Sequence, residues 1–459
     1  MYLLRGGGSA HYRYMDINQL CYYNLQTKSN YSMKMMNYLY AAAVAVIFSL
    51  GFSSCSSSDS SKNDGPNPTT PKEQKAYMET VAQELLSQVS ASDFDPIRNL
   101  AEYVKNNITR ASSSSSKTQV IDDFFENAVK ACTQVDQPDY VKYLFIGSNF
   151  AATFRYDGSR WQQVSTGGNS LQFLFTDDKG QQCSAIITKS GNEKEVHSSL
   201  FDEVKNRYVY DGGSYTPITK TTEYRFMVPE KVTATLTQGD ATLATVDVSI
   251  DISGLSNELN FQTDFTEVTV YANILSYTLA IDRLVAKGGG NASINVDLSK
   301  NGNSLISADV YAENVSATIT DRKVKDWTAG RGVVNIDVLG KVQVMGTVSN
   351  IRQFADAIEE TGSYTRDEAK FKSSVEKVNN MLDVGVYYSG NTDPKSYFKL
   401  YPFSEEKYGE TRWNAEPVIY FSDGSSYSTL KDFFDKDTFN GVIKKFEQLV
   451  TDFRNKFTI

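Results

Sequence analysis

The sequence predicts an α+β fold with N-terminal helices, a long antiparallel β-meander of hairpins, and C-terminal helices that pack on the sheet. Two observations lead to this prediction. Apolar residues recur at helical spacing in the first and last parts of the chain, and they alternate with polar residues in the middle. Runs of helices, then strands, then helices are typical of α+β proteins rather than of wound parallel sheets.

The N-terminal region has the layout of a signal peptide. Within residues 33–54, Lys34 supplies the positive charge, Tyr38–Leu50 the apolar stretch, and small residues then lead to Cys55. The apolar stretch is shorter than the roughly 20 residues that a membrane-spanning helix needs. Residues 1–32 show no periodicity, and we interpret them as a spurious or unstructured extension.

The residues that end this signal peptide, Phe52-Ser53-Ser54-Cys55, resemble a bacterial lipobox, with Phe where Leu is usual. This resemblance implies that Cys55 carries fatty acyl groups such as palmitate and becomes the mature N-terminus. We therefore expect a lipoprotein of the cell envelope that is anchored in the outer membrane. The sequence does not decide between the periplasmic face and the cell-surface face of that membrane. Residues 55–71 are rich in Ser, Asn, Gly and Pro, which predicts a flexible tether.

The chain is acidic, with a formal net charge of −9. Loss of the signal peptide makes it more acidic, because residues 1–54 hold four basic side chains and only one acidic side chain. An acidic surface repels polyphosphate, and no basic stripe interrupts it. We therefore expect no binding of nucleic acid.

Residues 72–140 form the predicted helical segment. A first helix starts at Thr70-Pro71, where Thr70 and Glu73 form a capping-box pattern with Pro at the first helical position. A second helix starts at Asp95-Pro96. A third carries an apolar stripe that includes Val120, Ile121, Phe124, Phe125, Ala128 and Val129.

Residues 141–349 form the predicted antiparallel β region, because here the apolar period changes to two. Asp157-Gly158 favours a tight hairpin turn, and Gly180, Gly239 and Gly302 mark three more turns between alternating runs. Val268–Ile281 alternates in the same way and belongs to the meander. Alternation of this kind is typical of antiparallel sheets with one solvated face.

Residues 350–459 form the predicted α+β C-terminal region, packed with the β region as one body. Asn350 caps one helix, and Thr365 begins a second capping-box pattern with Glu368. Strands are expected at Val384–Tyr388 and Val418–Phe421. A final helix follows, with apolar residues at Phe439, Val442, Ile443, Phe446, Leu449, Val450 and Phe453.

Three stretches of this body resemble a group of uncharacterised Bacteroidetes lipoproteins. They are the segment from Trp161 to Cys183, the hairpin Val232–Val248, and the closing run from Glu416 to Tyr427 with the helix after it. The likeness covers most of the chain from Lys72 on. It consists of structural hairpins, so it implies the same envelope location and no activity.

The sequence offers few groups for catalysis, and we predict no catalytic residue, metal site or cofactor. His197 lies in a polar stretch and is expected to be solvated, as are the carboxylate pairs Asp122-Asp123 and Asp177-Asp178. No nucleotide-binding or metalloprotease motif is present. Whether the protein is an enzyme stays open, and these observations favour a protein without catalytic activity.

Two further sets of residues are kept as possible sites. Cys132 and Cys183 could form a disulfide in an oxidising compartment, although two separate buried thiols are the simpler interpretation. Trp161, Trp327 and Trp413 could stack on sugars, or else pack in the core.

Three functions are compatible with these observations. The first is a non-catalytic, lipid-anchored module that binds a partner or supports envelope assembly. The second is a carrier of lipid or another apolar ligand, because an apolar sheet face between helices would suit a cavity, although a filled core gives the same pattern. The third is a protein that binds or acts on carbohydrate. The sequence does not identify the protein, glycan or lipid ligand.

Overall fold

The computed structural model describes residues 68–108, 151–199, 202–211, 214–223, 225–320, 323–407, 409–424, 426–433 and 439–457. All of these residues belong to one compact unit. Cys55, the tether before residue 68 and the predicted third helix at residues 120–129 lie outside the described residues.

Helices stand at both ends of the described chain, as predicted. The N-terminal group is α2 (Pro71–Gln88), η1 (Ala91–Phe94), α3 (Asp95–Tyr103) and η2 (Val104–Ile108). The C-terminal group is α6 (Ile351–Ser363), α7 (Glu368–Met381), α8 (Leu430–Phe433) and α9 (Asn440–Phe457).

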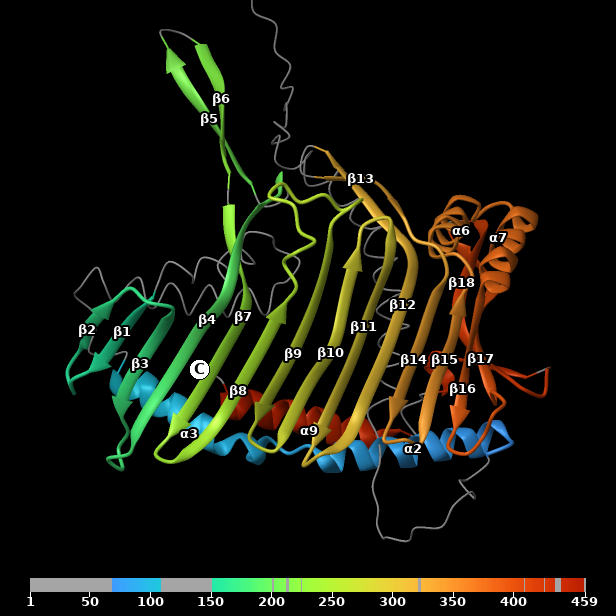
Figure 1. The fold of residues 1–459 in the computed structure, drawn as a ribbon. Coiled ribbons are helices and arrows are strands. Elements are labelled where there is room, and N and C mark those ends of the chain that lie inside the picture. The colour runs from blue at the N-terminus through green and yellow to red at the C-terminus, as the bar shows by residue number, and fades with distance from the viewer. Residues whose placement is uncertain are drawn as a thin grey trace, which may run out of the picture. The chain divides into compact units, whose positions relative to one another are not determined.

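Between and beyond these helices, the described residues form strands that are nearly all joined as hairpins (Figure 1). The strands are β1 (Ala152–Tyr156), β2 (Trp161–Thr166), β3 (Ser170–Thr176), β4 (Gln182–His197), β5 (Glu203–Asp211), β6 (Ser214–Thr222), β7 (Arg225–Gln238), β8 (Ala241–Ile250), β9 (Phe265–Ile274), β10 (Tyr277–Lys287), β11 (Gly290–Lys300), β12 (Asn303–Thr320), β13 (Lys323–Thr328), β14 (Gly332–Val338), β15 (Val342–Val348), β16 (Leu382–Tyr388), β17 (Ser396–Lys407), β18 (Glu410–Phe421) and β19 (Tyr427–Thr429).

Among the described residues, one open sheet takes up 17 of these strands. Its pairing runs β2–β1–β3–β4–β7–β8–β9–β10–β11–β12–β14–β15–β16–β17–β18–β19, and β13 pairs with the far end of β12. Among the pairings between the described strands, only that of β1 with β3 is parallel. Strands β5 and β6 form a separate two-stranded hairpin, the β5–β6 arm. The fold is therefore the predicted α+β meander.

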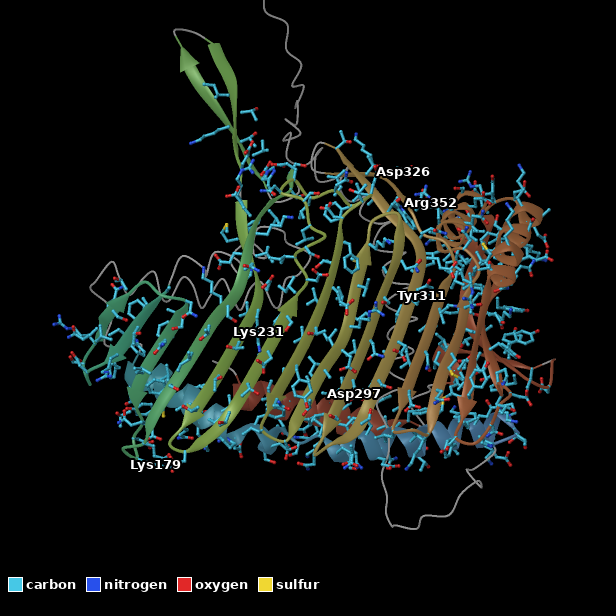
Figure 2. All side chains as sticks on the ribbon, viewed as in Figure 1. Lys179, Lys231, Asp297, Tyr311, Asp326 and Arg352 are labelled. Carbon is cyan, nitrogen blue, oxygen red and sulfur yellow. The ribbon has the colours of Figure 1, made fainter. Side chains whose placement is uncertain are left out.

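The two faces of this sheet differ in chemistry. Because paired residues point to the same side, the registers place apolar residues such as Val248, Val270 and Ile281 on one face. The other face carries polar side chains, among them Lys231, Asp297 and Tyr311, which are labelled in Figure 2. One solvated and one apolar face is the alternation that the sequence predicted.

The helices α2, α3 and α9 lie across one end of the strands (Figure 1). In α2 the apolar stripe Met78, Val81, Ala82 and Leu85 is buried. Ala82 packs with Phe439 and Val442 at the start of α9, so the two ends of the described chain meet here.

Hydrogen bonds fix the N-terminal helices to the apolar side of the sheet. The Tyr388 hydroxyl of β16 donates to Gln74 Oε1 over 3.3 Å. The Tyr277 hydroxyl of β10 donates to the carbonyl of Gln88 over 3.2 Å, and the Tyr103 hydroxyl donates to the carbonyl of Thr176 over 2.8 Å. This row of contacts from β16 to β3 means that the helices cover the apolar face at its end.

At the opposite end, α6 and α7 pack on the last long strands. Phe371, Val375 and Val378 of α7 are buried. The side chain of Asn379 exchanges two hydrogen bonds with the backbone of Leu400, at 2.8 and 2.9 Å. The C-terminal helices therefore do pack on the sheet, as predicted.

Local signals in the sequence were mostly correct. Thr70 and Glu73 form both hydrogen bonds of a capping box, and Asn350 caps α6. The cap of α7 was wrong: it is Asp367, whose side chain accepts from the amide of Lys370, and not Thr365. The alternating run Val268–Ile281 belongs to two strands, β9 and β10, which are separated by a turn at Leu275 with φ of +56°.

Candidate functional site: the apolar face of the sheet

The apolar face is defined by residues of seven neighbouring strands that share one side of the sheet. They are Val232, Ala234, Val246, Val248, Ile250, Val268, Val270, Ala272, Leu279, Ile281, Leu284, Ile294, Val296, Leu298, Ile306, Ala308, Val310, Val334 and Ile336. Most are β-branched, and β-branched side chains favour extended backbone. With strands about 4.8 Å apart, this set extends roughly 30 Å across β7 to β14.

Much of the apolar face is accessible in the described part of the chain. Leu279 is 38% exposed and Val310 is 41% exposed, and all the others except Ala272 are half-buried. At the start of β12 and the end of β14 the side chains are buried instead, because Leu305 and Val338 are only 2% and 1% exposed. No described helix covers the middle of the face, so its aliphatic side chains can contact a further apolar group.

The chemistry of the apolar face is uniform. The residues that define it are all Val, Ile, Leu or Ala, so none of them is charged or aromatic. Charges stand at its borders, where they are paired: Lys300 with Asp93 at 2.7 Å near the helices, and Lys189 with Glu193 at 2.6 Å on β4. The face can therefore offer nonpolar contact, and it offers no hydrogen-bonding groups from its side chains.

The structure does not bring the three tryptophans together. Trp161 lies on β2 and packs with Tyr156, Phe173 and Phe175. Trp327 lies on β13 under the Arg352 guanidinium, 4.9 Å from its ring centre, and Trp413 lies on β18 beside Phe371 and Lys372. Each ring is occupied by its own neighbours, so these residues form no shared platform.

Cys183 is buried among Leu100, Phe175 and Leu243, where burial raises the pKa of its thiol. Cys132 lies outside the described residues, so the predicted disulfide stays a prediction.

The expectation of a solvated His197 was wrong. The residue is 7% exposed, and both ring nitrogens face carboxylates: Nε2 lies 3.0 Å from Asp202 Oδ1, and Nδ1 contacts Glu258 Oε2. No pattern in the sequence indicated this cluster, because Glu258 is 61 residues away in the chain.

The expectation of a solvated Asp177 was also wrong, whereas Asp178 is exposed as expected. Asp177 accepts hydrogen bonds from the amides of Lys179 and Gln181 and from Gln238 Nε2. Burial alone would raise its pKa, but these hydrogen bonds, led by that from Gln238, hold the pKa below its ordinary value. Asp122-Asp123 lies outside the described residues.

Among the described residues, no helix is long and apolar enough to cross a membrane. No group of three or more His, Cys, Asp or Glu side chains in the same residues could hold a metal ion.

The sequence pattern predicted that one face of the sheet is apolar, but it contained no signal that this face is left accessible. The chain matches no family model, no curated protein and no solved structure.

Proposed function

We propose that this protein is a non-catalytic, lipid-tethered protein of the cell envelope that holds acyl chains on the apolar face of its sheet. The observation that carries the proposal is the accessible row of aliphatic side chains across β7 to β14. Water contact at such a surface is unfavourable, at about 25 cal/mol for each Å² of apolar area.

Acyl chains fit this surface better than a peptide or a sugar does. A peptide or a sugar carries polar groups that need partners when they are buried, and the side chains of the apolar face supply none. An acyl chain needs only nonpolar contact. The face is also long enough, because the chains of one leaflet fill about half of the roughly 30 Å hydrocarbon core of a membrane.

The predicted location in the cell envelope agrees with an acyl-chain ligand. A lipidated Cys55 and the tether of residues 55–71 would hold the body close to a membrane, which is a source of acyl chains. The resemblance to Bacteroidetes lipoproteins supports the same location.

A pair of adjacent substitutions tests the proposal with the full chain and the fluorescent fatty acid cis-parinaric acid. Val270 lies on the apolar face, and its neighbour Thr269 points to the polar face. We expect Val270→Asp to weaken binding at least about tenfold, because a carboxylate would be buried against the ligand. Thr269→Asp is the matched control, and its affinity should stay within about twofold of the original protein.

Two outcomes would overturn the proposal. One is that the original protein does not bind the fatty acid, or that both variants bind it equally. The other is that the thiol of Val270→Cys resists a maleimide in the absence of ligand, as judged by peptide mapping. The second result would mean that another part of the chain already covers the apolar face.

A further inference from the structure

His197 lies where three segments of the molecule meet. It is the last residue of β4, Asp202 directly precedes β5, and Glu258 belongs to the loop 251–264 between β8 and β9. The His197 amide donates to the carbonyl of Asn257 over 2.7 Å, and the Leu259 amide donates to the His197 carbonyl over 2.8 Å. The backbone and the side chain of one residue thus both hold this loop.

The two contacts of the imidazole demand two donors. Ionised carboxylates such as Asp202 and Glu258 accept hydrogen bonds and cannot donate them. A neutral imidazole donates from only one nitrogen, so it would turn the lone pair of the other nitrogen toward a carboxylate. Only the protonated ring satisfies both partners at once.

The charges around His197 favour that protonated form. From β7, Arg225 contacts Glu258 at 3.0 Å, and it also lies 3.4 Å from Glu195 of β4 and 3.6 Å from Glu223. The hydrogen bond to Glu258, followed by that to Asp202, raises the pKa of His197 above 6.5 in spite of burial. The same contact with His197, together with Arg225, lowers the pKa of Glu258.

We propose that His197 is a pH-sensitive latch, which fastens the loop 251–264 to the root of the β5–β6 arm while its imidazole is protonated. Release of the latch would loosen a small apolar cluster, because Leu255 and Leu259 of the loop pack against Val196, Phe226, Val228 and Ile252. The latch concerns the loop alone and does not depend on a ligand at the apolar face.

The direction of the pH effect follows from the raised pKa. Because the imidazole binds its proton more tightly in the folded protein, the stabilisation is complete below the ordinary His pKa of about 6.5. It is lost as the pH rises through the higher pKa of the folded state. The latch is therefore closed in mildly acidic conditions and loosens in alkaline ones.

Hydrogen exchange of the full chain tests the latch, with amide protection corrected for the intrinsic effect of pH. Between pH 6 and pH 9, we expect protection in the loop 251–264 to fall. The size of the fall is set by the difference between the pKa of His197 in the folded state and its ordinary pKa, at about tenfold for each unit of that difference. Protection in the hairpin Val232–Val248 should not follow this change. His197→Gln should give low loop protection at every pH.

A control and a second measurement make the test decisive. The control is Glu230→Gln, which removes a carboxylate that accepts hydrogen bonds from Asn192 in the same region of β4 and β7. Glu230 does not contact His197 in these hydrogen bonds, so the variant should keep the pH dependence of the loop. In a His11→Gln background, the proton resonance of His197 reports its titration directly. Glu258→Gln, which changes an exposed partner, should move that titration toward 6.5.

The latch is refuted if loop protection in the original protein does not depend on pH. It is equally refuted if His197→Gln keeps the same dependence, or if His197 titrates at or below 6.5.

Discussion

Asp177 shows how a single side chain holds one end of the sheet. Its carboxylate closes the turn after β3 through the amides of Lys179 and Gln181, at 2.9 and 2.8 Å. It also accepts from Gln238 Nε2 of β7 at 2.7 Å, so it ties the β3–β4 turn to the next hairpin. Hydrogen bonds to a charged acceptor are among the stronger ones in proteins.

We therefore expect Asp177→Ala to lower the free energy of unfolding by about 2 kcal/mol, because it leaves these donors without their acceptor. Asp178→Ala is the matched control, since Asp178 is exposed and its change should cost less than about 0.5 kcal/mol. Urea denaturation of both variants measures the difference. Equal stabilities would show that the turn does not depend on Asp177.

The pH dependence of this contribution has a fixed sign. The pKa of Asp177 lies below the ordinary value of 3.8, so its stabilisation is present above that pH. It is lost as the pH falls through the folded pKa. The cost of Asp177→Ala should accordingly shrink in strong acid.

At the scale of elements, α2 acts as a strap across one end of the strands. Its buried stripe supplies packing. Gln74, Glu84 and Gln88 connect it to β16, to the β14–β15 turn and to β10, through contacts with Tyr388, Lys341 and Tyr277. Isolated helices of this length are marginal in water, so its stability depends on this packing.

Leu85→Ala in α2 should destabilise the protein by about 3 kcal/mol, since the side chain is 6% exposed and its removal leaves a cavity. Ser87→Ala, at an exposed position two residues further along the same helix, should change stability by less than about 0.5 kcal/mol. Thermal unfolding followed by circular dichroism compares them. A loss below about 1 kcal/mol for Leu85→Ala would contradict the role of α2 as a strap.

Individual elements differed in how well the sequence predicted them, for physical reasons. Turns at Gly239 and Gly302 were predictable because glycine tolerates the positive φ that they adopt. The turn at Leu275 was not, because Leu rarely takes φ of +56° and here it packs against the cluster around Leu100. The cluster of His197 with Glu258 was invisible for another reason: it depends on contacts between distant segments.

For the candidate site, the pattern of residues predicts which face of the sheet is apolar, but it does not predict whether that face is exposed. Alternation at Val246, Val248 and Ile250 predicts an apolar side, and the structure confirms it. The same alternation occurs whether that side is covered by helices or accessible. Only the placement of α2, α3 and α9 at one end leaves the middle accessible among the described residues.

At the scale of the whole molecule, the anchor and the body should be separable. We expect Cys55→Ala to abolish incorporation of an alkyne fatty acid and to leave the body folded, because the tether is predicted to contribute nothing to the core. Metabolic labelling and far-UV circular dichroism measure the two effects. Equal labelling of both proteins, or a mature chain that retains residues before Cys55, would refute the lipoprotein prediction.

The pairing of α2 with α9 has a consequence for the order of folding. Each hairpin of the sheet joins strands that are neighbours in sequence, so it can form while the rest of the chain is still being synthesised. The contact of Ala82 with Phe439 and Val442 spans almost the whole chain and must come last. Helix α2 therefore completes its packing only after α9 has formed. In a chain that is truncated before Phe439, the apolar side chain of Ala82 would lack these contacts, and this end of the sheet would be exposed to chaperones and proteases.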